Sequence, residues 1–116
     1  MKINRLVVGN YLTNCYILSI DNKCLIIDPG DDYQDIINHV VNKTILVILI
    51  THTHFDHIGA VKYFNNEVYS YNNLKEKEYK IGDFIFDVIY TPGHTNDSIC
   101  FYFKNEGIMF TGDFLF

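Results

Sequence analysis

Three histidines and an aspartate gather in the stretch Thr51–Gly59, which reads Thr-His-Thr-His-Phe-Asp-His-Ile-Gly. Imidazoles and carboxylates are hard to explain as packing groups, because each needs its own hydrogen-bond partner once it is buried. A divalent metal ion would satisfy all of them at once. We therefore interpret His52, His54, Asp56 and His57 as candidate metal ligands.

The element that must position this cluster is the apolar run Ile45–Ile50, which comes directly before it. Such a run, bounded by polar residues, predicts a strand buried on both faces, so the cluster would lie at a strand end. If the chain stays extended, side chains two apart share a face, and His52, His54 and Asp56 can converge. His57 would join them from the start of the next element.

Two later residues could complete the ligand set. His94 follows a predicted strand at Phe84–Tyr90, within Thr-Pro-Gly-His-Thr, and Asp113 follows another at Ile108–Phe110. Taken singly, each is more simply interpreted as an exposed loop histidine or a turn-forming aspartate. Taken with the cluster, they supply further ligands at strand ends.

Imidazole and carboxylate ligands without a thiolate suit zinc, with iron and manganese as alternatives. A bound metal lowers the pKa of its water toward about 7, which makes hydroxide available at neutral pH without a protein nucleophile. The expected reaction is hydrolysis.

These motifs resemble those of one family. His52-Thr-His-Phe-Asp-His57 with Gly59, Thr-Pro-Gly-His94-Thr and Thr-Gly-Asp113-Phe-Leu-Phe are similar to the metallo-β-lactamase superfamily, and most to its glyoxalase II branch of thioester hydrolases. The segments Asn14–Leu18 and Ile26–Gly30 are also similar to that branch.

The resemblance implies an α/β fold, the N-terminal portion of an αββα sandwich with two mixed sheets, covering helices and a two-metal site at the edge between the sheets. It assigns the first metal to His52, His54 and His94, the second to Asp56 and His57, and the bridge to Asp113. Asp56 and Asp113 would also be catalytic, and a hydroxide between the metals would attack a thioester carbonyl.

Some features depart from the resemblance or extend it. Asp28 is expected to orient a ligand histidine, with a turn or helix-capping role as an equal alternative. Ala60 and Asp97 stand where the branch often has glycine.

We expect residues 1–116 to be a single domain that is incomplete at the C-terminus, since relatives continue to one more histidine. The isolated chain should then bind one metal well and a second weakly.

Composition excludes several classes. The 9 Lys and Arg against 14 Asp and Glu give a charge of −5, which disfavours nucleic acid as a partner. No signal peptide is visible and no apolar stretch approaches the roughly 20 residues that cross a bilayer, so we expect a cytoplasmic protein without a membrane partner. The 3 cysteines are odd in number and flanked by apolar residues, which predicts reduced core thiols.

The remaining elements follow from periodicity and turn residues. An opening antiparallel meander is expected at Lys2–Val8, Asn14–Ile20 and Lys23–Asp28, and further strands at Val68–Tyr69 and Ser98–Lys104. Asp31 or Asp32 would cap a helix that runs toward Ile45, and a second short helix would span Ile58–Phe64. The polar stretch Asn65–Lys80 predicts a surface excursion.

The leading function is thioester hydrolysis of glyoxalase II type, with a small-molecule substrate such as a glutathione-type thioester. One alternative is a non-catalytic or partially active fragment that binds metal, needs another chain to complete its fold and self-associates through an exposed apolar edge. Another is a nuclease or lactonase of the superfamily, although the acidic charge counts against a nuclease.

Overall fold

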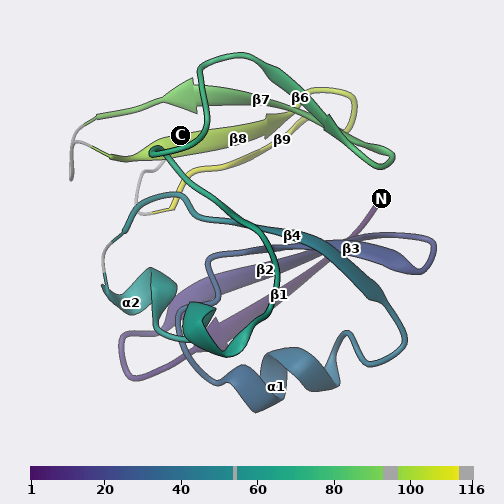
Figure 1. The fold of residues 1–116 in the computed structure, drawn as a ribbon, viewed down its shortest axis with the longest axis vertical. Coiled ribbons are helices and arrows are strands. Elements are labelled where there is room, and N and C mark those ends of the chain that lie inside the picture. The colour runs from purple at the N-terminus through teal and green to yellow at the C-terminus, as the bar shows by residue number, and fades with distance from the viewer. Residues whose placement is uncertain (54, 93–96, 113–116) are drawn as a thin grey trace.

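The computed structural model describes residues 1–53, 55–92 and 97–112. In this part of the chain, two sheets face each other and the helices lie on the outer side of the first sheet (Figure 1). The strand order is β1-β2-β3-β4-β5 in the first sheet and β6-β7-β8-β9 in the second. The layered α/β architecture expected from the sequence is confirmed.

The first sheet is mixed: strand pairing is antiparallel from β1 to β3 and parallel from β3 to β5. Its strands are β1 (Lys2–Val8), β2 (Thr13–Ile20), β3 (Lys23–Ile27), β4 (Thr44–Leu49) and β5 (Val68–Tyr69). The first three form the expected antiparallel meander, whereas β4 runs parallel to both β3 and β5. Because parallel strands end at the same edge of a sheet, the residues after β3, β4 and β5 are brought together there.

The second sheet is antiparallel throughout its described strands, where a mixed sheet was expected. Its strands are β6 (Glu78–Ile81), β7 (Phe84–Tyr90), β8 (Ile99–Phe103) and β9 (Ile108–Phe110). Tight turns at Gly82 (φ 57°) and Gly107 (φ 70°) join neighbouring strands, and such hairpins force antiparallel pairing. Most of β6 lies in the stretch Asn65–Lys80, which was expected to be a surface excursion. The sequence suggested a loop there because the exposed Glu78 and Lys80 give this strand a polar composition.

The helices are shorter than the sequence suggested. They are α1 (Tyr33–Asn38), α2 (Phe55–Ile58) and the 3₁₀ helix η1 (Val61–Tyr63). Asp32 is the N-cap residue of α1, as one of the two expected candidates, but its side chain forms no capping hydrogen bond. Its backbone is left-handed (φ 56°), and its carboxylate accepts a hydrogen bond from the Gly9 N–H at 3.0 Å. The apolar periodicity after Asn38 belongs instead to the approach to β4, where Ile45 lies.

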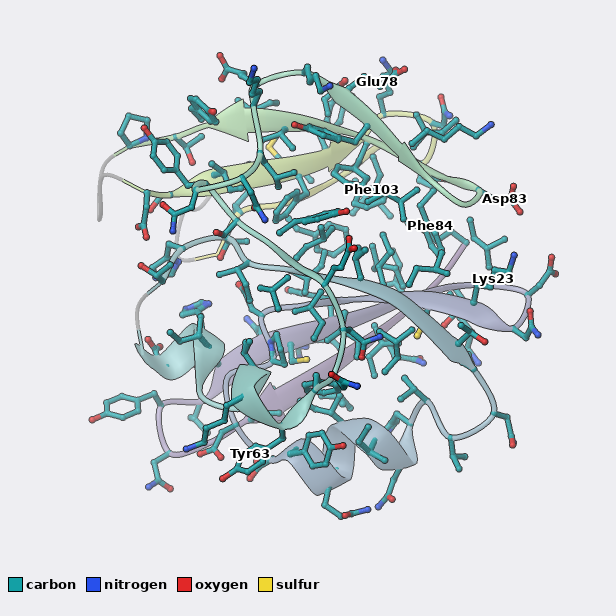
Figure 2. All side chains as sticks on the ribbon, in the orientation of Figure 1. Lys23, Tyr63, Glu78, Asp83, Phe84 and Phe103 are labelled. Carbon is teal, nitrogen blue, oxygen red and sulfur yellow. The ribbon has the colours of Figure 1, made fainter. Side chains whose placement is uncertain are left out.

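Aromatic side chains fill the space between the sheets. The alternation along β7 turns Phe84, Phe86 and Val88 toward the first sheet. Figure 2 shows Phe84 and Phe103 between the two layers. A second apolar cluster, which includes Ile17, Ile26, Ile36, Val40 and Ile48, lies between the first sheet and the helices. The helices and the second sheet thus cover both faces of the first sheet.

Cys15, Cys24 and Cys100 are free thiols and all are buried, as expected of core cysteines. Desolvation raises the pKa of Cys24 to about 11, despite the opposing effect of Lys43. Burial also raises the pKa of the Cys15 and Cys100 thiols. No helix in the described ranges is long and apolar enough to cross a membrane.

Candidate metal centre

The centre is built where the parallel strands β3 and β4 end. Asp28 follows β3, and Thr51 and His52 follow β4. The Asp28 N–H donates to the Leu49 carbonyl at 3.0 Å, which keeps the two strand ends in register. Asp28 has φ 55°, a left-handed conformation that aspartate adopts more readily than most residues. Asp28, Thr51 and His52 are all at most 2% exposed.

The Asp28 carboxylate is the hub of a buried hydrogen-bond network. It accepts from the Thr51 N–H at 2.8 Å, from the Thr51 hydroxyl at 2.6 Å and from His57 Nδ1 at 2.8 Å. An ionised carboxylate can only accept hydrogen bonds, so His57 Nδ1 must carry the proton. Asp28 thus orients His57, a candidate ligand, as the sequence suggested. It also forms the turn after β3, which was the alternative role.

The same network orients His52. Its Nδ1 lies 3.3 Å from the Thr51 hydroxyl oxygen, whose proton is already donated to Asp28. The His52 Nδ1 must therefore donate, and the lone pair of the ring is on Nε2. In both His52 and His57, Nε2 is the nitrogen able to bind a metal, and Nδ1 is tied to the protein interior.

Helix α2 brings the next two residues into place. Asp56 was expected in extended chain, but it lies in the first turn of α2 beside His57. Its Oδ2 is 3.6 Å from His57 Nε2 and accepts a hydrogen bond from the Thr13 hydroxyl at 3.1 Å. The rings of His52 and His57 are 4.2 Å apart between centroids. The structure thus brings three of the six predicted ligands together.

A close backbone approach holds α2 in this position. A Cβ added to Gly30 would lie 1.9 Å from the backbone oxygen of Asp56, so only glycine fits there. The neighbouring Pro29 carbonyl accepts a hydrogen bond from the Ala60 N–H at 2.9 Å. The sequence suggested only a turn at Pro29-Gly30 and gave no sign that Thr13 reaches Asp56, because both contacts are between residues distant in the chain.

The other three predicted ligands, His54, His94 and Asp113, lie outside the described residues. Their described neighbours still locate part of the site. A Cβ on Gly112 would lie 2.6 Å from the Thr51 hydroxyl oxygen and 3.4 Å from His52 Nδ1. The segment that leads to Asp113 therefore runs against the Asp28 network. Within residues 1–53, 55–92 and 97–112, no three His, Cys, Asp or Glu side chains form a group that could hold a metal ion by themselves.

A cavity of about 80 Å³ adjoins this network. Asp28, Asp56 and His57 line it, as do Tyr11 and Leu12 of the loop between β1 and β2. Tyr11 is 67% exposed and Leu12 is 71% exposed, so this loop also presents apolar surface to solvent. A small polar cavity beside two oriented imidazoles and a carboxylate is suited to a divalent cation and a reacting water.

A family model described as "Metallo-beta-lactamase superfamily" matches residues 8–68 and 70–116. The chain belongs to this superfamily. It is therefore a metal-binding hydrolase by family, as the sequence motifs predicted, and the donor set of His52, Asp56 and His57 suits divalent metal ions.

Individual relatives support the same family. The chain is 32% identical to "Probable metallo-hydrolase YqgX" of Bacillus subtilis, matching all of this chain and 72% of that protein. It is 41% identical to the hydroxyacylglutathione hydrolase of Francisella tularensis subsp. novicida, matching all of this chain and 53% of that protein. It thus spans about half the length of the latter relative.

The crystal structure of the BLEG-1 B3 metallo-beta-lactamase superposes with a TM-score of 0.91 at 31% identity, covering 99% of this chain and 73% of that one. The agreement extends across both sheets. The metallo-β-lactamase fold expected from the sequence is therefore confirmed.

Proposed function

We propose that this superfamily member hydrolyses a thioester of glyoxalase II type at a two-metal centre. His52, His54 and His94 would hold the first metal, Asp56 and His57 the second, and Asp113 would bridge them. The observation that carries the proposal is the hydrogen bond of 2.8 Å from His57 Nδ1 to Asp28, because it fixes the tautomer in which Nε2 can bind a metal.

The described side chains have distinct parts in this centre. Asp28 orients His57 directly and His52 through the Thr51 hydroxyl. The Thr13 hydroxyl holds Oδ2 of Asp56, which fixes the rotation of that carboxylate. Burial of His52 and His57 keeps bulk water away from the imidazoles. These residues prepare the site before any metal binds.

The chemistry proposed is addition of a water oxygen to the acyl carbon and cleavage of the carbon–sulfur bond. The proton lost by the attacking water is delivered to the leaving sulfur, so the products are a thiol and a carboxylic acid. When bound, divalent metal ions lower the pKa of a coordinated water toward about 7 and polarise the carbonyl. We assign catalytic roles to Asp56 and Asp113, since a carboxylate oxygen can accept a proton of the attacking water. Zinc is the proposed metal, with iron and manganese as alternatives.

The substrate assignment rests on the hydroxyacylglutathione hydrolase relative at 41% identity. Two neighbouring cavities, of about 80 Å³ and about 290 Å³, share Tyr11, Thr13 and Asp56 in their lining, which favours a small-molecule substrate. A glutathione-type thioester is the proposed substrate, and a cytoplasmic location goes with it as part of the proposal.

The test is metal uptake and hydrolysis by the purified chain and by two histidine variants. The metal-free chain is loaded with zinc, iron or manganese, and retained metal is measured by elemental analysis. A glutathione thioester, a lactone, a β-lactam and a short RNA are then compared as substrates. We expect retained metal and preferential cleavage of the thioester.

The His57→Ala variant should bind one metal equivalent less than the wild type, because it lacks a ligand. Its hydrolysis rate should be lower by at least about tenfold. His39→Ala is the matched control, since His39 is exposed and its Nδ1 contacts the Asp35 carbonyl one turn before it. A chain that retains no metal, or equal metal content in the two variants, contradicts the metal centre. Preferential cleavage of the lactone, β-lactam or RNA contradicts the substrate assignment.

A further inference from the structure

The loop that carries the predicted ligand His94 is connected to the rest of the site through Asp97. This loop joins β7 to β8, and a hydrogen bond of 3.0 Å from the Thr91 N–H to the Ser98 carbonyl closes its base. The Asp97 carboxylate oxygen Oδ2 accepts two hydrogen bonds from Thr53, one from its N–H at 3.2 Å and one from its hydroxyl. A loop of the second sheet is therefore joined to the strand end of the first.

The position of Thr53 makes this connection relevant to chemistry. Thr53 stands between His52 and His54, two predicted ligands of the first metal. Just before them, the Thr51 carbonyl accepts a hydrogen bond from the Ile99 N–H at 2.8 Å, which fixes the start of β8 against the same strand end. The two sheets thus meet at the site through hydrogen bonds on both sides of His52.

We propose that Asp97 is a positioning residue for the metal centre: its hydrogen bonds to Thr53, called the clasp here, hold the chain just before β8 against the segment after β4 that contains His52. This inference rests on the proposed function, which assigns His52, His54 and His94 to one metal. The clasp fixes Asp97 and Thr53 relative to each other before metal binds, so less conformational entropy is lost when the ligands converge. A residue without a side-chain acceptor at this position could not form these bonds.

Two other roles of Asp97 must be distinguished from positioning of the metal centre. The negative charge of Asp97 could raise metal affinity by itself, without any effect of the hydrogen bonds. Alternatively, the bonds to Thr53 could stabilise the fold without preparing the metal site. Variants that separate charge from hydrogen bonding distinguish a positioning role from both of these.

Four variants make the comparison. Asp97→Ala removes the charge and both hydrogen bonds, whereas Asp97→Asn removes the charge but keeps an acceptor oxygen. Thr53→Val removes the hydroxyl donor and leaves the charge of Asp97 intact. Asp83→Ala is the matched control, because this carboxylate lies in the turn between β6 and β7 at the end of the sandwich away from α2 (Figure 2).

The readouts are the zinc dissociation constant, measured by competition with a chromophoric chelator, and the visible spectrum of the cobalt-loaded chain. Asp97→Ala should weaken zinc binding by about 10-fold to 100-fold, the usual range for a residue that orients a metal ligand. Thr53→Val should weaken zinc binding by a smaller factor. The cobalt spectrum should change in the same direction in Thr53→Val as in Asp97→Ala. Asp97→Asn should rescue most of the affinity, and Asp83→Ala should match the wild type.

Amide hydrogen exchange of Thr53 in the metal-free chain tests the clasp without any metal. Exchange should be faster in Asp97→Ala than in Asp97→Asn or the wild type. Unchanged exchange in Asp97→Ala, or zinc affinity that falls equally in Asp97→Asn and Asp97→Ala while Thr53→Val is normal, overturns the positioning role. Failure of the wild-type chain to bind zinc instead contradicts the proposed metal centre on which the inference rests.

Discussion

At the scale of single residues, the Asp28 carboxylate connects several described residues of the site. One buried carboxylate oxygen accepts from both the Thr51 hydroxyl and His57 Nδ1, and the other accepts from the Thr51 N–H. Because Thr51 also contacts His52, the orientation of the His52 and His57 imidazoles depends on this carboxylate. Asp28 is therefore important for both the stability of the strand ends and the affinity of the metal centre.

Asp28→Ala should lower the free energy of unfolding by about 3 to 5 kcal/mol, since it breaks a buried charged network. Zinc affinity should fall by about 10-fold to 100-fold, because His57 loses the partner that fixes its tautomer. Urea denaturation and a zinc competition titration measure the two effects.

Two controls separate the network from the backbone conformation of Asp28. Asp21 has a similar left-handed backbone (φ 53°) in an exposed turn, so Asp21→Ala should show only the strain of alanine there, about 1 to 2 kcal/mol. Asp28→Asn keeps an acceptor and tolerates φ above zero, and its effect should be intermediate. Wild-type zinc affinity in Asp28→Ala would mean that His57 is oriented by other groups.

At the scale of elements, the site depends on how α2 is seated. This helix has only four residues, Phe55–Ile58, and cannot be stable by itself. Its position is set by the segment after β3, where Gly30 lies directly against the Asp56 backbone. The approach leaves no room for a side chain and presents Asp56 and His57 to the strand ends.

Gly30→Ala should displace α2, because the added Cβ would meet backbone rather than a movable side-chain end. We expect a loss of stability of about 1 to 3 kcal/mol, as for other overpacked sites, together with weakened zinc binding. Thermal or urea unfolding and the zinc titration measure both.

Gly107→Asn is the control for Gly30→Ala. A Cβ at Gly107 meets nothing within 4 Å, and asparagine tolerates its φ of 70°. This variant should keep the zinc affinity of the wild type. Equal zinc affinity in Gly30→Ala and Gly107→Asn would show that α2 tolerates the extra methyl group.

At the scale of the whole molecule, packing between the sheets determines whether the site edge forms. The first sheet supplies Asp28, Thr51 and His52, and the second supplies the strands on either side of the His94 loop. The layers are joined by one apolar core that contains Phe86 of the second sheet and Leu18 and Leu49 of the first. Across the same interface, the rings of Tyr16 in β2 and Phe110 in β9 lie 4.9 Å apart between centroids.

Phe86→Ala should lower the free energy of unfolding by about 3 to 5 kcal/mol through loss of burial and creation of a cavity. Phe86→Leu should lose less, because it fills part of that volume. Val41→Ala, at a residue that is 74% exposed, should change stability by less than about 0.5 kcal/mol. Urea denaturation compares the three, and equal stability of Phe86→Ala and Val41→Ala would contradict a core that joins the sheets.

Local sequence determined much of this protein. Apolar runs and alternation predicted β1, β7 and β9 with their correct ends, since each strand buries side chains at a fixed period. The ligand motifs predicted the family, because chemistry restricts which residue types can occur together. The assignment of all six metal ligands, and of residues 1–116 to one domain that is incomplete at the C-terminus, stays a prediction.

The tertiary structure decided what depends on contacts between distant residues. The side chain of Asp32 looked like a helix cap, but Gly9 takes its carboxylate; Glu78–Ile81 looked like a loop, but β7 pairs with it as an edge strand. The partners of the site, Thr13 for Asp56 and Asp97 for Thr53, lie 43 and 44 residues away along the chain. Sequence patterns report the local period and the chemistry of a residue, whereas such pairings form only when distant strands, helices and loops pack together.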